Sequence, residues 1–203
     1  ATIAVFIAAP LKPIPCPLGT FCLGGVKSNL TVPWIPSDAS GAAAPQPCVE
    51  GRYCRFATPT AGGSGPCFAG HYCPPQANYP TQAARGAFAA GEFNVAPTLC
   101  FPGTYAPLLG HAACIPCPSG HSCEGYGTYE PKVCAHGTYR GAQDSVSCKI
   151  CPRGTFTPHT GVSTVTDCQP CPMGRICGIA EMSNLTTQSG PCPEGHTCGE
   201  RTT

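Results

Sequence analysis

The chain has 203 residues, including 18 Cys, 25 Gly and 25 Pro, and a formal net charge of +1. Leu, Ile, Val and Phe together number only 33, about a sixth of the chain, and below roughly 20 % a shared hydrophobic core is not expected. The net charge of +1 is too low for a chain that stays disordered because of its charge. The sequence contains no cluster of basic residues, so binding to nucleic acid or to anionic lipid is not expected.

The cysteine content indicates an oxidising location. Cysteine makes up about 9 % of the residues, close to the level that marks disulfide scaffolds, and the number of cysteines is even. Disulfides persist outside the cytosol, so we expect an extracellular protein, secreted or at the cell surface. Charged residues are only 10 % of the chain, which predicts that either glycans or association with other chains covers its surface.

The N-terminal arm, residues 1–15, contains an alternating apolar stretch. Ile3, Val5 and Ile7 point to one side of a predicted strand, Phe6 points to the other, and prolines follow. About nine apolar residues are too few to span a bilayer, so no membrane insertion is expected within these residues. An unpaired apolar strand is a template for strand addition, so we expect the arm to dock on an adjacent repeat or a second copy. The alternative is packing on its own first repeat.

Six copies of the frame CxxGxxC follow the arm, each preceded by proline. Residues 16–99 hold three of them, separated by long Pro, Gly and Ala-rich spacers. A recurring frame of this kind predicts a disulfide-stapled turn used as a repeat. The first cysteines of the six frames are Cys16, Cys48, Cys67, Cys117, Cys171 and Cys192.

A second unit, CxxGTY or CxxGTF with a later return cysteine, appears in residues 100–177, where the repeats are closely spaced. Its copies begin at Cys100, Cys134 and Cys151, and their return cysteines are Cys114, Cys148 and Cys168. Residues 178–203 form a terminal CxxGxxC unit with a spacer. We expect the aromatic residue near each glycine to lie over a neighbouring disulfide.

Pairing neighbouring cysteines leaves none unpaired. The expected pairs are Cys16 with Cys22, Cys48 with Cys54, Cys67 with Cys73, Cys100 with Cys114, Cys117 with Cys123, Cys134 with Cys148, Cys151 with Cys168, Cys171 with Cys177, and Cys192 with Cys198. Sequence alone does not determine connectivity, and crossed pairing within residues 114–134 is the main alternative. A zinc site is a second alternative, because the CxxC steps at residues 148–151 and 168–171 have suitable spacing.

Other candidate sites are sparse. Two sequons predict N-glycosylation at Asn29 and Asn184. Histidine recurs in one position of the frame, at His71, His121 and His196, where a metal or pH-sensing row competes with a tolerant exposed turn. No GxSxG, HExxH or P-loop motif occurs, so neither an enzyme nor a cofactor is expected.

The expected fold consists of small disulfide-rich repeats. A cross-link between sequence neighbours fixes its own turn, contributing about 2 kcal/mol for a seven-residue loop and about 3 kcal/mol for a fifteen-residue loop. Modules held in this way contact only their neighbours, so we expect an elongated stack of short β-ribbons and turns, with little helix and no single hydrophobic core.

The runs CFPGTYAPLLGHAACIPCPSGHSC and CKICPRGTFTPHTGVSTVTDCQPCPMGRIC resemble the cysteine-rich GTY repeats of ephrin-receptor-like and TNF-receptor-like ectodomains. Similar repeats occur in large protist and algal surface proteins, including flagellar-hair proteins. The resemblance covers residues 100–177 well and the outlying frames partly. It implies extended β-ribbon repeats used for adhesion, surface coating or ligand display.

Two functional expectations remain. The first is a structural repeat segment of an extracellular glycosylated fibre, hair or cell-surface coat, assembling head-to-tail with copies of itself or with adjacent repeats of a longer chain. The second is the stalk or ligand-binding ectodomain of a receptor or adhesin. The presence of only one Trp favours the first, because Trp and Arg anchor many binding interfaces.

Overall fold

The structure, a computed structural model, describes residues 14–22, 26–27, 45–142, 146–177, 189–201 and 203. The chain divides into two compact units: Ala1–Ala83, Ala89–Thr98 and Gly110–Ala112 in the first, and Ala84–Phe88, Leu99–Leu109 and Ala113–Thr203 in the second. Several sequence predictions lie outside the described residues: the assembly strand at Ile3, Val5, Phe6 and Ile7, and the sequons at Asn29 and Asn184.

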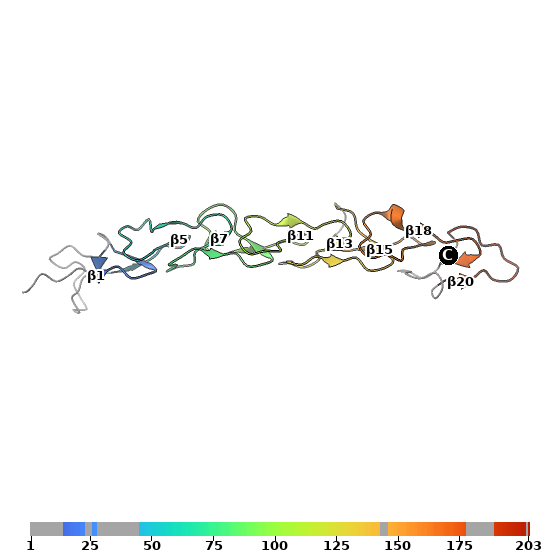
Figure 1. Cartoon of the computed structure of the whole chain (residues 1–203), viewed down its shortest axis with the longest axis horizontal. Coiled ribbons are helices and arrows are strands. Elements are labelled where there is room, and N and C mark those ends of the chain that lie inside the picture. The colour runs from blue at the N-terminus through green and yellow to red at the C-terminus, as the bar shows by residue number, and fades with distance from the viewer. Residues whose placement is uncertain (1–13, 23–25, 28–44, 143–145, 178–188, 202) are drawn as a thin grey trace, which may run out of the picture. The chain divides into compact units, whose positions relative to one another are not determined.

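The regular structure consists of two-residue strands and one short 3₁₀ helix, η1 (Val165–Asp167), in the described part of the chain (Figure 1). The strands are β1 (Ile14–Pro15), β2 (Thr20–Phe21), β3 (Val26–Lys27), β4 (Gln46–Pro47), β5 (Arg52–Tyr53), β6 (Gly65–Pro66), β7 (His71–Tyr72), β8 (Thr81–Gln82), β9 (Ala87–Phe88), β10 (Thr98–Leu99), β11 (Thr104–Tyr105), β12 (Ile115–Pro116), β13 (His121–Ser122), β14 (Lys132–Val133), β15 (Thr138–Tyr139), β16 (Lys149–Ile150), β17 (Thr155–Phe156), β18 (Gln169–Pro170), β19 (Arg175–Ile176) and β20 (Gly190–Pro191).

The strands pair antiparallel, two at a time. The first unit contains the pairs β1–β3, β2–β4, β5–β6 and β7–β8, and the second contains β11–β12, β13–β14, β15–β16, β17–β18 and β19–β20. In the β13–β14 pair, His121 lies opposite Val133 and Ser122 opposite Lys132. Many of these strands end in proline, which a short edge strand tolerates because its N–H is not needed for a ladder.

Nine disulfides close the turns between the strands. They join Cys16 with Cys22, Cys48 with Cys54, Cys67 with Cys73, Cys100 with Cys114, Cys117 with Cys123, Cys134 with Cys148, Cys151 with Cys168, Cys171 with Cys177, and Cys192 with Cys198. Their Cα–Cα distances run from 5.7 to 6.0 Å, within the range of protein disulfides. These are the neighbour pairs expected from the sequence, and the crossed alternative is not what the structure contains.

The buried apolar residues form small clusters around disulfides. One contains Phe156 with Cys171 and Cys177, and another contains Cys67, Cys73 and Ala77. Most described cysteines are fully buried, while large side chains such as Leu108 and Met173 are exposed. Sulfur atoms and small side chains therefore fill the interior, which confirms the predicted fold of disulfide-rich repeats.

We expect a peptide map of the unreduced protein to contain only links between neighbouring cysteines, because each pair is already adjacent in its own turn. Digestion without reductant, followed by mass spectrometry, measures this. Thiol titration before and after reduction is the control. The native protein should contain no free thiol. A peptide linking Cys114 to Cys134, or bound zinc in place of disulfides, would contradict the structure.

Candidate functional site: the joint between successive modules

Ten segments of the chain share one seven-residue frame, and we name three of its positions. The first is the opening residue, the fourth is the frame glycine, and the seventh is the closing residue. The modules are called by their opening residues: Cys16, Cys48, Cys67, Ala83, Cys100, Cys117, Cys134, Cys151, Cys171 and Cys192. Except at the Ala83 module, the opening residue forms a disulfide.

The frame glycine makes two backbone hydrogen bonds to the next module. In the Cys117 module, the N–H of Gly120 donates to the carbonyl of Arg140, and its carbonyl accepts from the N–H of Cys134, both at 2.8 Å. Arg140 and Cys134 are the closing and opening residues of the next module. The first unit contains the same two bonds between Gly51 and the Cys67 module, each at 2.9 Å.

The same bonds are present near both ends of the described chain. In the first unit, the carbonyl of Cys54 accepts from the N–H of Gly19 at 2.9 Å. In the second unit, the carbonyl of Cys198 accepts from the N–H of Gly174 at 3.0 Å. Cys54 and Cys198 each also form the short disulfide predicted for them from the sequence. A closing cysteine therefore has two roles, because its sulfur closes its own turn and its carbonyl joins the preceding module.

A second pair of backbone bonds completes the joint. The closing residue Arg140 donates its N–H to the carbonyl of Val162 at 3.0 Å, and the opening residue Cys134 accepts at its carbonyl from the N–H of Gly161 at 2.9 Å. Both partners belong to the loop of the following module. The complete joint therefore contains four backbone hydrogen bonds, each worth about 1 kcal/mol net, and it uses no side chain.

Two properties of the backbone explain why the fourth position is glycine. Gly120 has φ of +72°, in the left-handed region that only glycine enters freely. A Cβ at Gly120 would also overlap the carbonyl of Gly161, which belongs to the second module along the chain. A similar backbone carbonyl, from Arg201, lies against Gly154. Gly174 has φ of +81°, but no atom of the described residues lies close to where its Cβ would be.

Chemically different residues occupy the closing position, and most of them are buried. It holds cysteine in six modules, and in the others it holds Ala89, Ala106, Arg140 and Thr157. These four side chains are all buried, although only a cysteine there forms the short disulfide across the turn. In the modules of Cys100, Cys134 and Cys151, the opening cysteine pairs instead with a cysteine further along. Backbone position, rather than sulfur chemistry, thus defines the frame.

Residues 83–89 form a module that contains no cysteine. Within the first unit, Ala83 donates its N–H to the carbonyl of Gly70, and Ala89 accepts from the N–H of Gly70, both at 2.8 Å. Within the second unit, Gly86 makes the same pair of bonds with Ala106 and Cys100. From the sequence this stretch is expected to be part of a spacer, and the structure corrects that expectation. The spacing of the frames is the sequence signal that could have revealed this module, since Ala83 follows Cys67 by 16 residues and precedes Cys100 by 17.

Arg140 shows how a charged residue fills the closing position. Its side chain is only 2 % exposed, and its Nη1 donates to the carbonyls of Pro118 at 3.1 Å and His121 at 3.0 Å. A longer contact of 3.4 Å reaches the carbonyl of Cys117. Burying a guanidinium is costly unless its donors are paired. The turn of the preceding module supplies these acceptors, so Arg140 adds side-chain bonds to the joint.

The aromatic residues near the frame glycine cover disulfides in part of the chain. Tyr53 packs against the cluster around Cys67 and Cys73, and Phe156 packs with Cys171 and Cys177. In both cases the disulfide belongs to the next module. The predicted stacking of rings over neighbouring disulfides is therefore present at Tyr53 and Phe156.

Each histidine of the frame lies close to a backbone carbonyl of its own turn. The Nδ1 atoms of His71, His121 and His196 lie 3.4, 3.0 and 3.3 Å from the carbonyl two residues earlier. In the described part of the chain, no group of three or more His, Cys, Asp or Glu could hold a metal ion. Cys148 and Cys151 are bonded to Cys134 and Cys168, so the four-cysteine zinc alternative is not formed.

Introducing cysteine at both Ala83 and Ala89 is expected to create a tenth disulfide. These buried residues occupy the opening and closing positions that carry a disulfide in the neighbouring Cys67 module. The double variant A83C/A89C should retain no free thiol, as measured by thiol titration and mass spectrometry. A matched variant, A83C/A87C, also adds two buried cysteines but places one at a strand position, and it should contain two free thiols when both variants are titrated in denaturant. Free thiols in A83C/A89C would contradict the assigned frame.

Replacing Gly120 by alanine is expected to disturb its joint more than the same change at Gly174. Both positions have positive φ, so both variants carry a backbone penalty of about 1–2 kcal/mol. Only Gly120 of the two faces a carbonyl from a later module among the described residues. Hydrogen exchange at the amides of Cys134 and Cys192, which donate to the two glycines, measures the difference. Exchange should accelerate at least tenfold more at Cys134 in G120A than at Cys192 in G174A. Equal acceleration would show that the second-module contact has no effect.

In the described part of the chain, no helix has the length and apolar content needed to cross a membrane. Residues 125–168 match the family model described as tyrosine-protein kinase ephrin type A/B receptor-like. No curated protein matches the chain. The matched stretch contains the Cys134 module and most of the Cys151 module, with their long disulfide loops. Residues 125–168 are therefore similar to the cysteine-rich ephrin-receptor-like repeats of extracellular ectodomains, and the disulfide-bonded modules of the structure fit such repeats.

Proposed function

We propose that the chain is a structural repeat segment of an extracellular glycosylated fibre, hair or cell-surface coat. The observation that carries the proposal is the joint of four backbone hydrogen bonds between successive modules. Because it depends on main-chain atoms, the joint tolerates Cys, Ala, Arg and Thr at the same buried position. A repeat of this kind can be added many times, and its disulfides protect its turns from proteolysis.

The side chains favour a structural role over recognition of one specific partner. Only 10 % of the residues are charged, and the sequence contains a single Trp. Interfaces that bind a specific protein usually contain clustered Trp, Tyr and Arg anchors. We propose that glycans at Asn29 and Asn184 provide solvation for this weakly charged surface.

Assembly is proposed to proceed head-to-tail through the N-terminal arm. Ile3, Val5 and Ile7 would form an added strand on an adjacent repeat or a second copy, with Phe6 on the opposite side. Contacts between different surfaces of identical subunits generate open filaments when their rotation does not close into a ring. In this proposal the arm binds a glycosylated copy of the same chain or an adjacent repeat of a longer chain.

A stalk or ligand-binding ectodomain of a receptor or adhesin is the second candidate. The observation that favours it is the match of residues 125–168 to the ephrin-receptor-like family. In this case the repeats would act as a spacer or display a binding surface, and the protein would be a monomer with a saturable ligand.

Deleting residues 1–9 is expected to abolish filament formation while leaving the disulfides intact. Negative-stain electron microscopy and light scattering of the native glycosylated protein measure assembly. The substitutions L108S/L109S remove two exposed leucines elsewhere and serve as a control that should still assemble. Unchanged assembly after the deletion would disprove the role of the arm. A native protein that stays monomeric would support the ectodomain candidate instead.

A further inference from the structure

We propose that the loop Gly127–Val133 is a carbohydrate-binding site that accepts one sugar ring. These seven residues line an open hollow of about 500 Å³ within the second unit. Binding pockets for small ligands usually have volumes of about 300–1,000 Å³. This inference does not depend on the assembly proposed above.

The loop is held in place at both ends. At its start, the N–H of Gly127 donates to the carbonyl of Cys100 at 2.8 Å, and the carbonyl of Thr128 accepts from the N–H of Ala106 at 3.0 Å. At its end, Lys132 and Val133 form strand β14, which pairs with β13. Pro131 restricts the backbone between these two anchors. The hollow is therefore formed before a ligand binds, which lowers the ordering cost of binding.

An arginine side chain lies beside an aromatic ring of this loop. The guanidinium carbon Cζ of Arg85 lies 5.8 Å from the centroid of the Tyr129 ring, within the outer limit of about 6 Å for a cation–π contact. Tyr129 is nevertheless 50 % exposed. The ring can thus offer its free surface to the apolar C–H face of a sugar, while its hydroxyl can hydrogen-bond to the sugar's edge.

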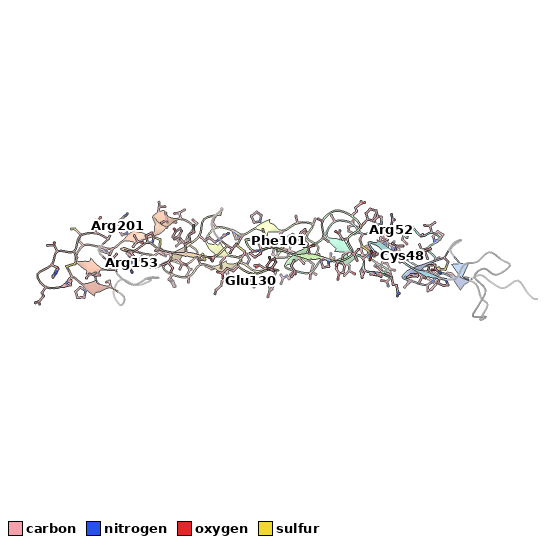
Figure 2. All side chains as sticks on the ribbon, turned by 180° about the vertical axis from the view of Figure 1, so that it is seen from behind. Cys48, Arg52, Phe101, Glu130, Arg153 and Arg201 are labelled. Carbon is pink, nitrogen blue, oxygen red and sulfur yellow. A yellow bond between two sulfur atoms is a disulfide. The ribbon has the colours of Figure 1, made fainter. Side chains whose placement is uncertain are left out.

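Two oppositely charged side chains follow the ring. Glu130, labelled in Figure 2, and Lys132 are exposed, and neither side chain has a hydrogen-bond or ion-pair partner among the described residues. The Glu130 carboxylate can accept hydrogen bonds from sugar hydroxyls, and the Lys132 ammonium can donate to hydroxyl or ring oxygens. Their charges offset each other, so the site favours a neutral polyhydroxylated ligand over an anion or a cation.

The first unit contains a related loop that lacks the charged pair. The guanidinium carbon of Arg55 lies 5.6 Å from the Tyr79 ring centroid, and Pro80 and strand β8 follow the ring. Strand β8 holds Thr81 and Gln82 where the second-unit loop has Lys132 and Val133, and no glutamate lies between Tyr79 and Pro80. Tyr79 is also half exposed. It provides an internal control for ring stacking without carboxylate and ammonium groups.

The test is saturation-transfer NMR on the full chain, with mannotriose and chitotriose as probes and glycerol as a non-ring polyol control. Wild-type protein should transfer saturation to at least one trisaccharide with millimolar affinity, and not to glycerol. Y129A should weaken binding at least tenfold, and E130Q should weaken it severalfold. Y79A should leave it unchanged. Hydrogen exchange at Gly127 confirms that each variant keeps the loop anchored.

Each outcome decides the proposal. Loss of binding in Y129A and E130Q but not in Y79A supports the site. No transfer from wild-type protein, equal loss in Y79A and Y129A, or full binding by Y129A would overturn it. Repeating the titration after enzymatic removal of N-glycans identifies the source of the sugar, because occupancy by the chain's own glycans makes free trisaccharide bind more tightly after their removal.

Discussion

The peptide groups of the frame glycine hold each module to the next within both units. One N–H and one C=O of the same residue meet the closing and opening residues of the following module, as at Gly51 and Gly120. Buried peptide groups must be paired, so a module without this partner would leave polar groups exposed or unsatisfied. In six of the ten modules a short disulfide closes the turn that presents the glycine, and in the other four a buried Ala, Arg or Thr occupies the closing position instead.

Much of the fold can be predicted from the cysteines because each bridge is local. Closing a loop of seven or fifteen residues requires only neighbouring sequence, so the bond between Cys117 and Cys123 is visible in the spacing of its frame. The antiparallel strand pairs lie on either side of the loops that connect successive frames, as β13 and β14 do on either side of the loop between Cys123 and Cys134. The ring positions of Tyr53 and Phe156 could likewise be anticipated from their place beside the frame glycine.

The features that the sequence did not indicate depend on backbone geometry and burial rather than on cysteine. Ala83 and Ala89 fill frame positions because a methyl group also fits the buried space there, and the joint needs only their N–H and C=O groups. Arg140 fills another such position because the preceding turn happens to present carbonyls to its guanidinium. The cysteine pattern therefore does not reveal these residues as members of the frame. The hollow of Gly127–Val133 depends on contacts with Cys100 and Ala106, which lie too far away in sequence to be inferred.

The unequal loop lengths between modules have an evolutionary consequence. The stretch between Cys22 and Cys48 is far longer than that between Cys123 and Cys134, yet β2 still pairs with β4 as β13 pairs with β14. Insertions are therefore tolerated between joints without shifting their register. Gene duplication and slippage could lengthen or diversify such an array one repeat at a time, with mutation free to alter the outward loops.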